Sequence, residues 1–205
     1  MMKRIASYLL LCVLCLAVLG SASAASPETD SSDWPDVPFA RRIETGEIIY
    51  LGMDKAEAEA IAGAPLEEAE IRRDRFSFGK NLYVCDGITL AFRDDRVVFI
   101  EIPYEDPYWA NDELTPAKDP RWAANGVVMP FMPTDQALEA LGMTSEEVNP
   151  PYRLIYFEDG TRAQFDRNMF EKGYMEYPWE ITLHGDSQTI GAIWMGDKQY
   201  ITMFR

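Results

Sequence analysis

The segment LYVCDGITLAFRDDRVVFIEI, residues 82–102, decides the fold because apolar and polar positions alternate along it. Two turn signals interrupt the alternation, Asp-Gly at 86–87 and Asp-Asp at 94–95. Such pairs favour the tight turns of β-hairpins. Ile88, Leu90 and Phe92 follow one another at intervals of two positions and are therefore expected to share one face of their strand. The segment predicts an antiparallel meander of three strands.

A short helix is expected just before the meander, in LGMDKAEAEAIAGAP, residues 51–65. Asp54 can cap its N-terminus, and Glu57 follows three residues later, as in a capping box. Apolar residues recur along one face at helical spacing, and Gly63 is placed to end the helix. The pattern predicts a helix over 54–62 with one apolar stripe.

A loose copy of this pattern occurs downstream, in PFMPTDQALEALGMT, residues 130–144. Thr134 can cap this second helix and Gly142 can end it. The C-terminal segment TIGAIWMGDKQYITMFR, residues 189–205, matches the last hairpin of the meander, with its turn at 197–198. Both halves of the chain therefore suggest a helix followed by antiparallel strands.

We therefore expect an α+β fold built as a tandem repeat, in which a short helix or helix pair packs on a three- to four-stranded antiparallel sheet in each half. Burying the helix stripe on the apolar sheet face gives a two-layer unit. The expected divisions are a signal peptide at 1–24, an acidic Ser/Pro-rich tether at 25–45, the first repeat at 46–102, an aromatic and proline-rich connector at 103–125, and the second repeat at 126–205 with an insertion near 168–180.

A helix opened by Leu-Gly-Met plus a capping residue, closed by glycine and followed by a meander with an Asp-rich last turn, resembles the repeat unit of the β-lactamase inhibitor protein-like group. That group includes the small outer-membrane lipoproteins of the barrel-assembly machinery. The resemblance covers most of residues 46–102 and extends over 126–205. It implies two repeats whose sheets grip another protein on a concave surface, without catalysis. The chain lacks the inhibitor's cysteines and the lipoproteins' lipobox, so no contact residue is carried over.

The N-terminus has the pattern of a signal peptide, with basic residues at 3–4, an apolar stretch over 8–19 and small residues at 22–24. The apolar stretch is shorter than the ~20 residues of a membrane-spanning helix. We therefore expect a secreted or otherwise extracytoplasmic protein, extracellular or periplasmic, with no stable membrane span after signal removal. An uncleaved anchor is the alternative.

The charge of the chain restricts its partners. The formal net charge is −15, and it becomes −17 when Lys3 and Arg4 leave with the signal peptide, since no acidic residue precedes Glu28. Nucleic acid is not expected as a partner, because its binding depends on Lys and Arg that neutralise phosphates. The expected partner is an extracellular or envelope protein with a cationic surface.

Motifs for catalysis or metal binding are not found in the sequence. His184 is the only histidine, which excludes sites built from two or three histidines. Cys85 remains as the only cysteine after signal removal, and we expect an inert buried thiol, with intermolecular pairing as the alternative. Paired carboxylates, such as those at 67–68 and 146–147, are typical of solvated faces in so acidic a chain. We expect no cofactor, no metal and no enzymatic activity.

Aromatic residues gather in the connector and in the later insertion. Loops of this length without regular structure are often functional, and Tyr and Trp are enriched where proteins bind one another. The rings either pack across the junction between the halves or form a contact surface. The candidate binding residues are Tyr104, Tyr108, Trp109, Trp122, Tyr177 and Trp179.

Three functions are compatible with these patterns. The first is an exported, non-catalytic module that binds a protein through its sheet surface and aromatic connector. The second is a carbohydrate or peptidoglycan binder in which tryptophan rings stack on sugar faces. The third is a hydrolase that uses carboxylates and His184, which requires these groups to converge in one pocket.

Overall fold

The chain divides into two compact units, Met1–Asp33 and Trp34–Arg205, and the computed structural model describes residues of the second. The described residues are 34–63, 70–73, 81–102, 120–144, 151–165, 176–185 and 187–201. The predicted signal peptide at 1–24 lies outside them. Among the described residues, no helix has the length and apolar character needed to cross a membrane.

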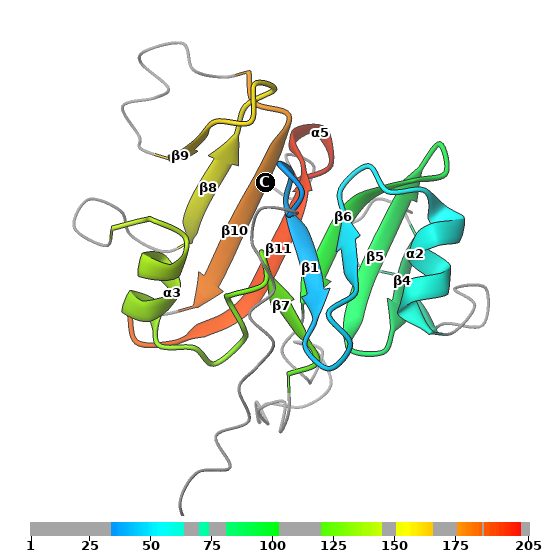
Figure 1. The fold of residues 1–205 in the computed structure, drawn as a ribbon, viewed down its shortest axis with the longest axis horizontal. Coiled ribbons are helices and arrows are strands. Elements are labelled where there is room, and N and C mark those ends of the chain that lie inside the picture. Colours follow the sequence, from blue (N-terminus) through cyan, green and yellow to red (C-terminus); the bar gives the residue numbers. More distant parts are fainter. Residues whose placement is uncertain are drawn as a thin grey trace, which may run out of the picture. The chain divides into compact units, whose positions relative to one another are not determined.

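Eight antiparallel strands form the larger sheet, in the order β3-β4-β5-β6-β11-β10-β8-β9 (Figure 1). The predicted meander is confirmed, because β4, β5 and β6 pair as consecutive neighbours. The backbone at 86–87 and 94–95 has positive φ, as tight hairpin turns require. The strands are β3 (Glu70–Arg73), β4 (Asn81–Cys85), β5 (Ile88–Arg93), β6 (Arg96–Ile102), β8 (Tyr152–Tyr156), β9 (Arg162–Gln164), β10 (Trp179–Gly185) and β11 (Ile190–Asp197).

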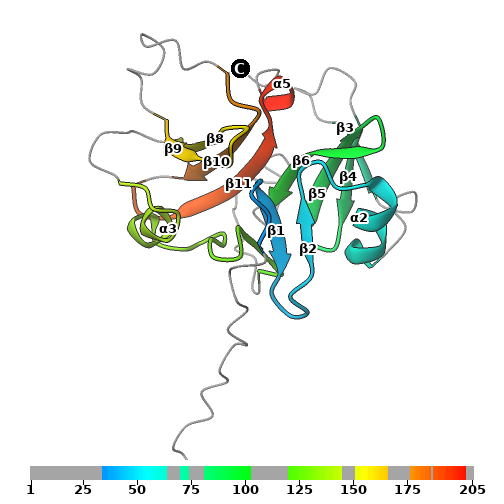
Figure 2. The same ribbon diagram turned by 45° about the horizontal axis from the view of Figure 1, so that its top comes forward.

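A second sheet of three strands has the order β2-β1-β7, and it lies beside β5 and β6 in both views (Figures 1 and 2). Its strands are β1 (Phe39–Arg42), β2 (Ile48–Tyr50) and β7 (Trp122–Ala124). β1 lies within residues 25–45 and β7 within 103–125. The ordered fold therefore includes parts of the segments predicted as tether and connector.

Three helices complete the described fold: α2 (Lys55–Ala62), α3 (Thr134–Ala140) and α5 (Lys198–Ile201). The predicted cap of α2 is confirmed, since Asp54 Oδ1 accepts a hydrogen bond of 2.9 Å from the Ala56 N–H. Gly63 ends α2 in the left-handed conformation, with φ of 79°. The predicted cap of α3 is wrong, because Pro133 is the N-cap and Thr134 is the first helical residue.

The main hydrophobic core lies on one face of the eight-stranded sheet. It joins side chains of that sheet to α2, α3 and the three-stranded sheet, among them Ala40, Ala58, Ile100 and Leu138. A smaller core lies on β5, β6 and α5, where the Phe99 ring stacks on Tyr200 with 4.9 Å between ring centroids. Both faces of the central strands are therefore buried.

The predicted tandem repeat, with a helix on its own three- to four-stranded sheet in each half, is wrong. β6 and β11 pair from Phe99↔Gly196 to Ile102↔Ile193, so both halves of the chain contribute to one eight-stranded sheet. Two separate small sheets would leave β6 and β11 as edges with unpaired backbone groups, and their pairing removes both edges. The coarser expectation holds, since the fold is an antiparallel, sheet-rich α+β arrangement.

The predicted closing hairpin over 189–205 is also wrong in the part of it that the structure describes. β11 continues to Asp197, and α5 begins at the next residue. Asp197 Oδ1 accepts a hydrogen bond of 2.6 Å from the Tyr200 N–H, which is the contact of a helix cap. The aspartate that seemed to mark a turn therefore starts a helical turn.

Candidate functional site

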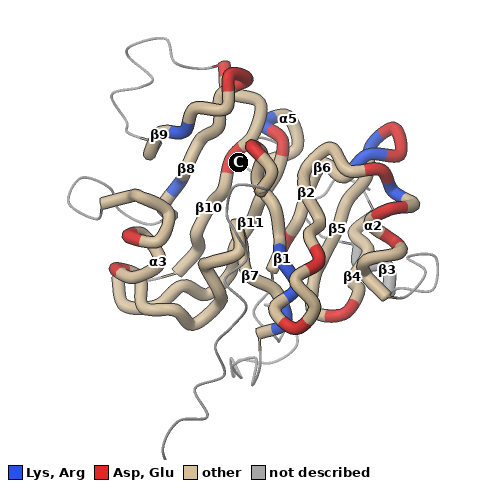
Figure 3. Tube along the Cα trace, in the orientation of Figure 1, with Lys and Arg blue, Asp and Glu red and all other residues tan. Residues whose placement is uncertain are grey.

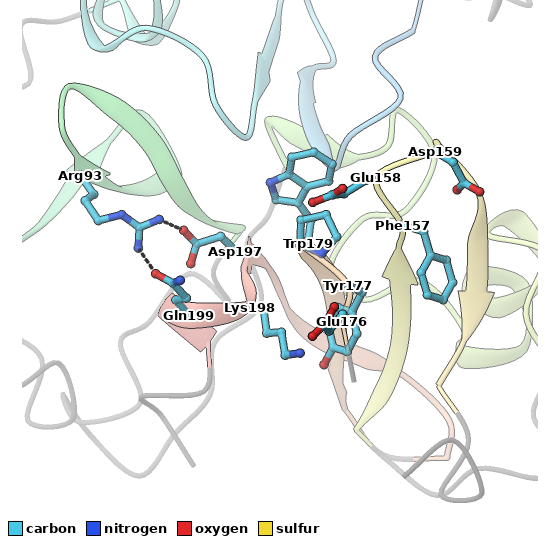
Figure 4. Close-up of a pocket in the computed structure, with 11 residues that line it drawn as sticks. Arg93, Phe157, Glu158, Asp159, Glu176, Tyr177, Trp179, Asp197, Lys198 and Gln199 are labelled. Atoms are coloured by element: carbon cyan, nitrogen blue, oxygen red, sulfur yellow. Dashed lines mark hydrogen bonds and ion pairs between the residues drawn. The ribbon is translucent and has the colours of Figure 1, made fainter. Parts of the chain in front are cut away.

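An open pocket of about 670 Å³ lies at one end of the eight-stranded sheet, where β5, β8 and β11 end and β10 begins. Figure 4 shows its side chains as sticks. Aromatic and charged residues line it together, which is the composition of a binding site rather than of a void in the core. The lining residues are Arg93, Phe157, Glu158, Asp159, Glu176, Tyr177, Pro178, Trp179, Asp197, Lys198 and Gln199.

The turn between β8 and β9 forms the acidic side of the pocket (Figure 3). Asp159 Oδ1 accepts hydrogen bonds from the N–H of Thr161 at 2.9 Å and from its hydroxyl at 2.6 Å. These hydrogen bonds lower the pKa of Asp159 below its ordinary value. Asp159 therefore stays negatively charged at neutral pH, next to the exposed Glu158.

The opposite side is built from the ends of β5 and β11. Arg93 forms an ion pair with Asp197 and donates a hydrogen bond of 3.4 Å to Gln199 Oε1 (Figure 4). Arg93 and Asp197 lie far apart in the sequence, and the pairing of β6 with β11 brings their strands together. The seam of the sheet therefore assembles this side of the pocket.

A buried polar network lies beneath the pocket and holds Tyr177. Its hydroxyl donates to Glu180 Oε2 at 2.7 Å and accepts from Arg153 Nη2 at 3.0 Å. Arg153 and Glu180 form an ion pair of 2.6 Å, with side chains 11% and 1% exposed. Burial, followed by the charge and the hydrogen bond of Glu180, raises the pKa of Tyr177 to about 12. Tyr177 therefore stays a neutral phenol in a fixed position.

The balance of charge in the pocket is negative. Its lining contains four carboxylates and two cations, which leaves a difference of two negative charges. Of the cations, Arg93 is paired with Asp197, and Lys198 has its ammonium over the Tyr177 ring. Carboxylates beside aromatic faces attract ammonium and guanidinium groups.

Two of the six predicted binding residues, Tyr177 and Trp179, lie in this pocket. Trp122 does not, because it is fully buried in the main core, and its indole N–H donates to the Asp86 carbonyl at 2.9 Å. Tyr104, Tyr108 and Trp109 lie outside the described residues. The structure thus joins Tyr177 and Trp179 and separates them from Trp122.

Residues that sequence reasoning missed make up most of the pocket. The turn at 158–159 was visible as a turn, but nothing in its sequence indicated what faces it. Arg93 and Lys198 were missed because the end of β5 and the start of α5 are brought together only by the pairing of β6 with β11, which is not local in the sequence. The aromatic composition near Trp179 was the one signal that pointed to this end of the sheet.

His184 lies on β10 and does not line the pocket. Its ring lies against Trp194, with 4.1 Å between centroids, and the Trp194 indole N–H donates to Glu101 Oε1 at 3.2 Å. Burial lowers the pKa of His184 to about 4. The carboxylates of the pocket and the imidazole therefore do not converge in one site. The alternative of a carboxylate-based hydrolase requires that they do.

The low pKa of His184 predicts a loss of stability in mild acid. In the unfolded chain His184 takes up a proton near pH 6.5, whereas in the folded protein it does so only near pH 4. The free energy of unfolding is therefore not reduced by this group above pH 6.5, and it decreases as the pH falls from 6.5 towards 4. From pH 7 to pH 5, this group alone lowers the free energy of unfolding by about 2 kcal/mol. Urea unfolding at both pH values should show a smaller loss in His184→Gln than in the wild-type protein. An equal loss in both proteins would contradict this assignment.

Cys85 is buried, and its thiol lies 3.6 Å from the Ala62 carbonyl oxygen, to which it donates. This position fits the inert thiol that the sequence predicted and leaves the sulfur inaccessible to a second chain.

Within the described residues, no group of three or more His, Cys, Asp or Glu side chains is placed to hold a metal ion. The pocket is the candidate site among the described residues. Comparison of the chain with protein-family models, with curated proteins and with solved structures finds no match, so the resemblance inferred from the repeat pattern stays a prediction.

Proposed function

We propose that this chain is an exported, non-catalytic binding module that accepts a cationic side chain of a protein partner in the pocket at the end of the eight-stranded sheet. The observation that carries the proposal is the meeting of carboxylates with Tyr177 and Trp179 in one open pocket. Aromatic anchors surrounded by charges of one sign are typical of protein-binding sites. Lysine and arginine side chains fit both features of the pocket.

The rigidity of the pocket supports this function. Tyr177 is held by Arg153 and Glu180, and Trp179 lies at the start of β10, paired with both Tyr156 and Asp197. Side chains fixed before binding lose little conformational entropy when a partner arrives. The negative charge of the whole chain also attracts a cationic partner from a distance.

Sugar binding is less well supported by the same residues. A sugar platform needs flat, exposed aromatic faces, whereas Tyr177 is 4% exposed and Trp179 is half-buried. Trp179 alone offers a small surface for stacking. We therefore place the carbohydrate-binding alternative second.

The proposal predicts that the full chain binds the peptide acetyl-RGRGR-amide and does not bind acetyl-EGEGE-amide. Trp179→Ala should weaken binding of the arginine peptide by about fivefold or more, because aromatic anchors at hot spots contribute that much. Isothermal titration at low and at physiological ionic strength checks this, and binding should weaken at the higher salt.

A double variant separates the pocket from the general charge of the protein. Glu158→Gln with Glu176→Gln removes two exposed carboxylates from the pocket, whereas Glu44→Gln with Glu57→Gln removes two exposed carboxylates elsewhere. We expect the pocket pair to weaken peptide binding more than the control pair. Equal effects of the two pairs, together with an unchanged affinity in Trp179→Ala, would refute the proposed function.

A further inference from the structure

The side of the pocket opposite the acidic turn presents a guanidinium that keeps hydrogen-bond donors for a ligand. Arg93 pairs with Asp197 through Nη2 and donates to Gln199 Oε1 through Nη1 at 3.4 Å. Because a guanidinium has five N–H donors, these two contacts leave three for another acceptor. The Arg93 side chain is 46% exposed, so a ligand in the pocket is able to reach it.

Asp197 holds this guanidinium in place. Its Oδ2 pairs with Arg93, and its Oδ1 accepts the hydrogen bond of 2.6 Å from the Tyr200 N–H. Both oxygens of the carboxylate are therefore engaged within the protein. The Asp197 side chain is only 14% exposed, so Arg93 is the accessible member of the pair.

The acidic turn and the Arg93 side of the pocket lie on either side of Trp179. Trp179 on β10 pairs with Asp197 on β11 and with Tyr156 on β8, and the acidic turn directly follows Tyr156. Neighbouring strands are about 4.8 Å apart, which separates the two sides by roughly 10 Å at the backbone. Figure 4 shows Arg93 on one side of Trp179 and Asp159 on the other. The pocket therefore offers two groups of opposite charge to one ligand.

We infer that the pocket binds a segment of the partner in which a carboxylate lies next to the lysine or arginine, and that Arg93 binds this carboxylate while the cation lies between Trp179 and the acidic turn. This inference rests on the proposed function of the pocket and adds a second recognised group. The carboxylate belongs either to an acidic residue that follows the cation or to the C-terminus of the partner. Consecutive Cα atoms are about 3.8 Å apart, so a long cationic side chain is able to span the rest of the distance in both cases.

Two pairs of peptides, each differing by one carboxylate, test the inference. The first pair is acetyl-RGRGR with a free C-terminus and acetyl-RGRGR-amide, and the second is acetyl-RGRGRE-amide and acetyl-RGRGRQ-amide. The ratio of the two affinities within a pair cancels any change that affects both peptides equally. In at least one pair, this ratio should be about two- to fivefold higher in the wild-type chain than in Arg93→Gln, as for a partly exposed ion pair. The pair that responds identifies the source of the carboxylate.

Arg96→Gln is the matched control. Arg96 pairs with Arg93 across the hairpin of β5 and β6 and donates to the Gly52 carbonyl at 3.3 Å, but it does not line the pocket. Its substitution removes the same charge from the same hairpin, so it measures the long-range effect of charge on the ratio. The ratio should fall more in Arg93→Gln than in Arg96→Gln. Arg93→Lys keeps the charge without the planar fork and should give an intermediate ratio.

Isothermal titration of the full chain and its variants with the four peptides distinguishes the outcomes. A change of the ratio in Arg93→Gln that is no larger than in Arg96→Gln, for both pairs of peptides, would overturn the inference. If Trp179→Ala still weakens the binding of acetyl-RGRGR-amide in that case, the proposed function stands and only the role of Arg93 is lost. A wild-type chain that binds none of the four peptides would refute the proposed function and this inference together.

Discussion

Glu180→Ala is expected to lower the free energy of unfolding by about 3–5 kcal/mol, the cost of leaving a buried partner charge uncompensated. Glu180 is 1% exposed and bonds the Arg153 guanidinium, the Tyr177 hydroxyl and the Thr182 hydroxyl. The substitution leaves the 11% exposed Arg153 side chain without this carboxylate. Urea unfolding monitored by circular dichroism at neutral pH measures the change.

Two further variants test whether the lost ion pair is the cause. Arg153→Met combined with Glu180→Leu removes both charges and keeps apolar volume, so it should recover much of the stability that Glu180→Ala loses. Glu44→Ala removes an exposed carboxylate and should change stability by no more than about 0.5 kcal/mol. A loss below about 1 kcal/mol in Glu180→Ala would mean that the network is not held as described.

Trp122→Ala should also destabilise the protein by about 3–5 kcal/mol, because it empties a fully buried site in the main core. The indole N–H loses its bond to the Asp86 carbonyl, and the Arg42 guanidinium, 4.9 Å from the ring, loses an aromatic contact. Thermal and urea unfolding measure the loss. Trp122→Phe keeps an aromatic ring and should lose less.

This variant also separates the core from the binding surface. At temperatures where Trp122→Ala is still folded, its affinity for acetyl-RGRGR-amide should equal that of the wild-type chain, in contrast to Trp179→Ala. An accessible, functional Trp122 would show the reverse, with unchanged stability and weaker binding. The two tryptophans therefore report on different properties of the same protein.

Features that depend on neighbouring residues could be predicted from the sequence. Asp54 caps α2 and Gly63 ends it because both interactions span a few residues. The turns at 86–87 and 94–95 are likewise local, since their positive φ angles suit the Asp and Gly found there.

Features that depend on distant segments could not be predicted. The pairing of β6 with β11 joins two apolar strands from opposite halves of the chain, and neither strand carries a signal for its neighbour. The pairing of β1 with β7 could not be predicted for the same reason. Because of this pairing, Phe39–Arg42 is a strand of the fold and not part of a tether. Asp197 was misread because aspartate favours turns and helix caps alike.

The candidate site shows the same division. Aromatic composition selected Tyr177, Trp179 and Trp122 together, since composition does not distinguish a buried ring from one beside a pocket. Burial is decided by packing. Trp122 is buried because β7 pairs with β1 and the side chains of this sheet pack in the main core. Lys198 could not be assigned to the site before β11 was seen to end beside Pro178 and Trp179.

The most direct test of the binding account is a measurement of intermolecular nuclear Overhauser effects between acetyl-RGRGR-amide and the labelled full chain. The account predicts contacts from the arginine side-chain protons to the Trp179 indole and the Tyr177 ring, and their loss when salt releases the peptide. Bound peptide that contacts neither ring, or that contacts the other tryptophans instead, would contradict it.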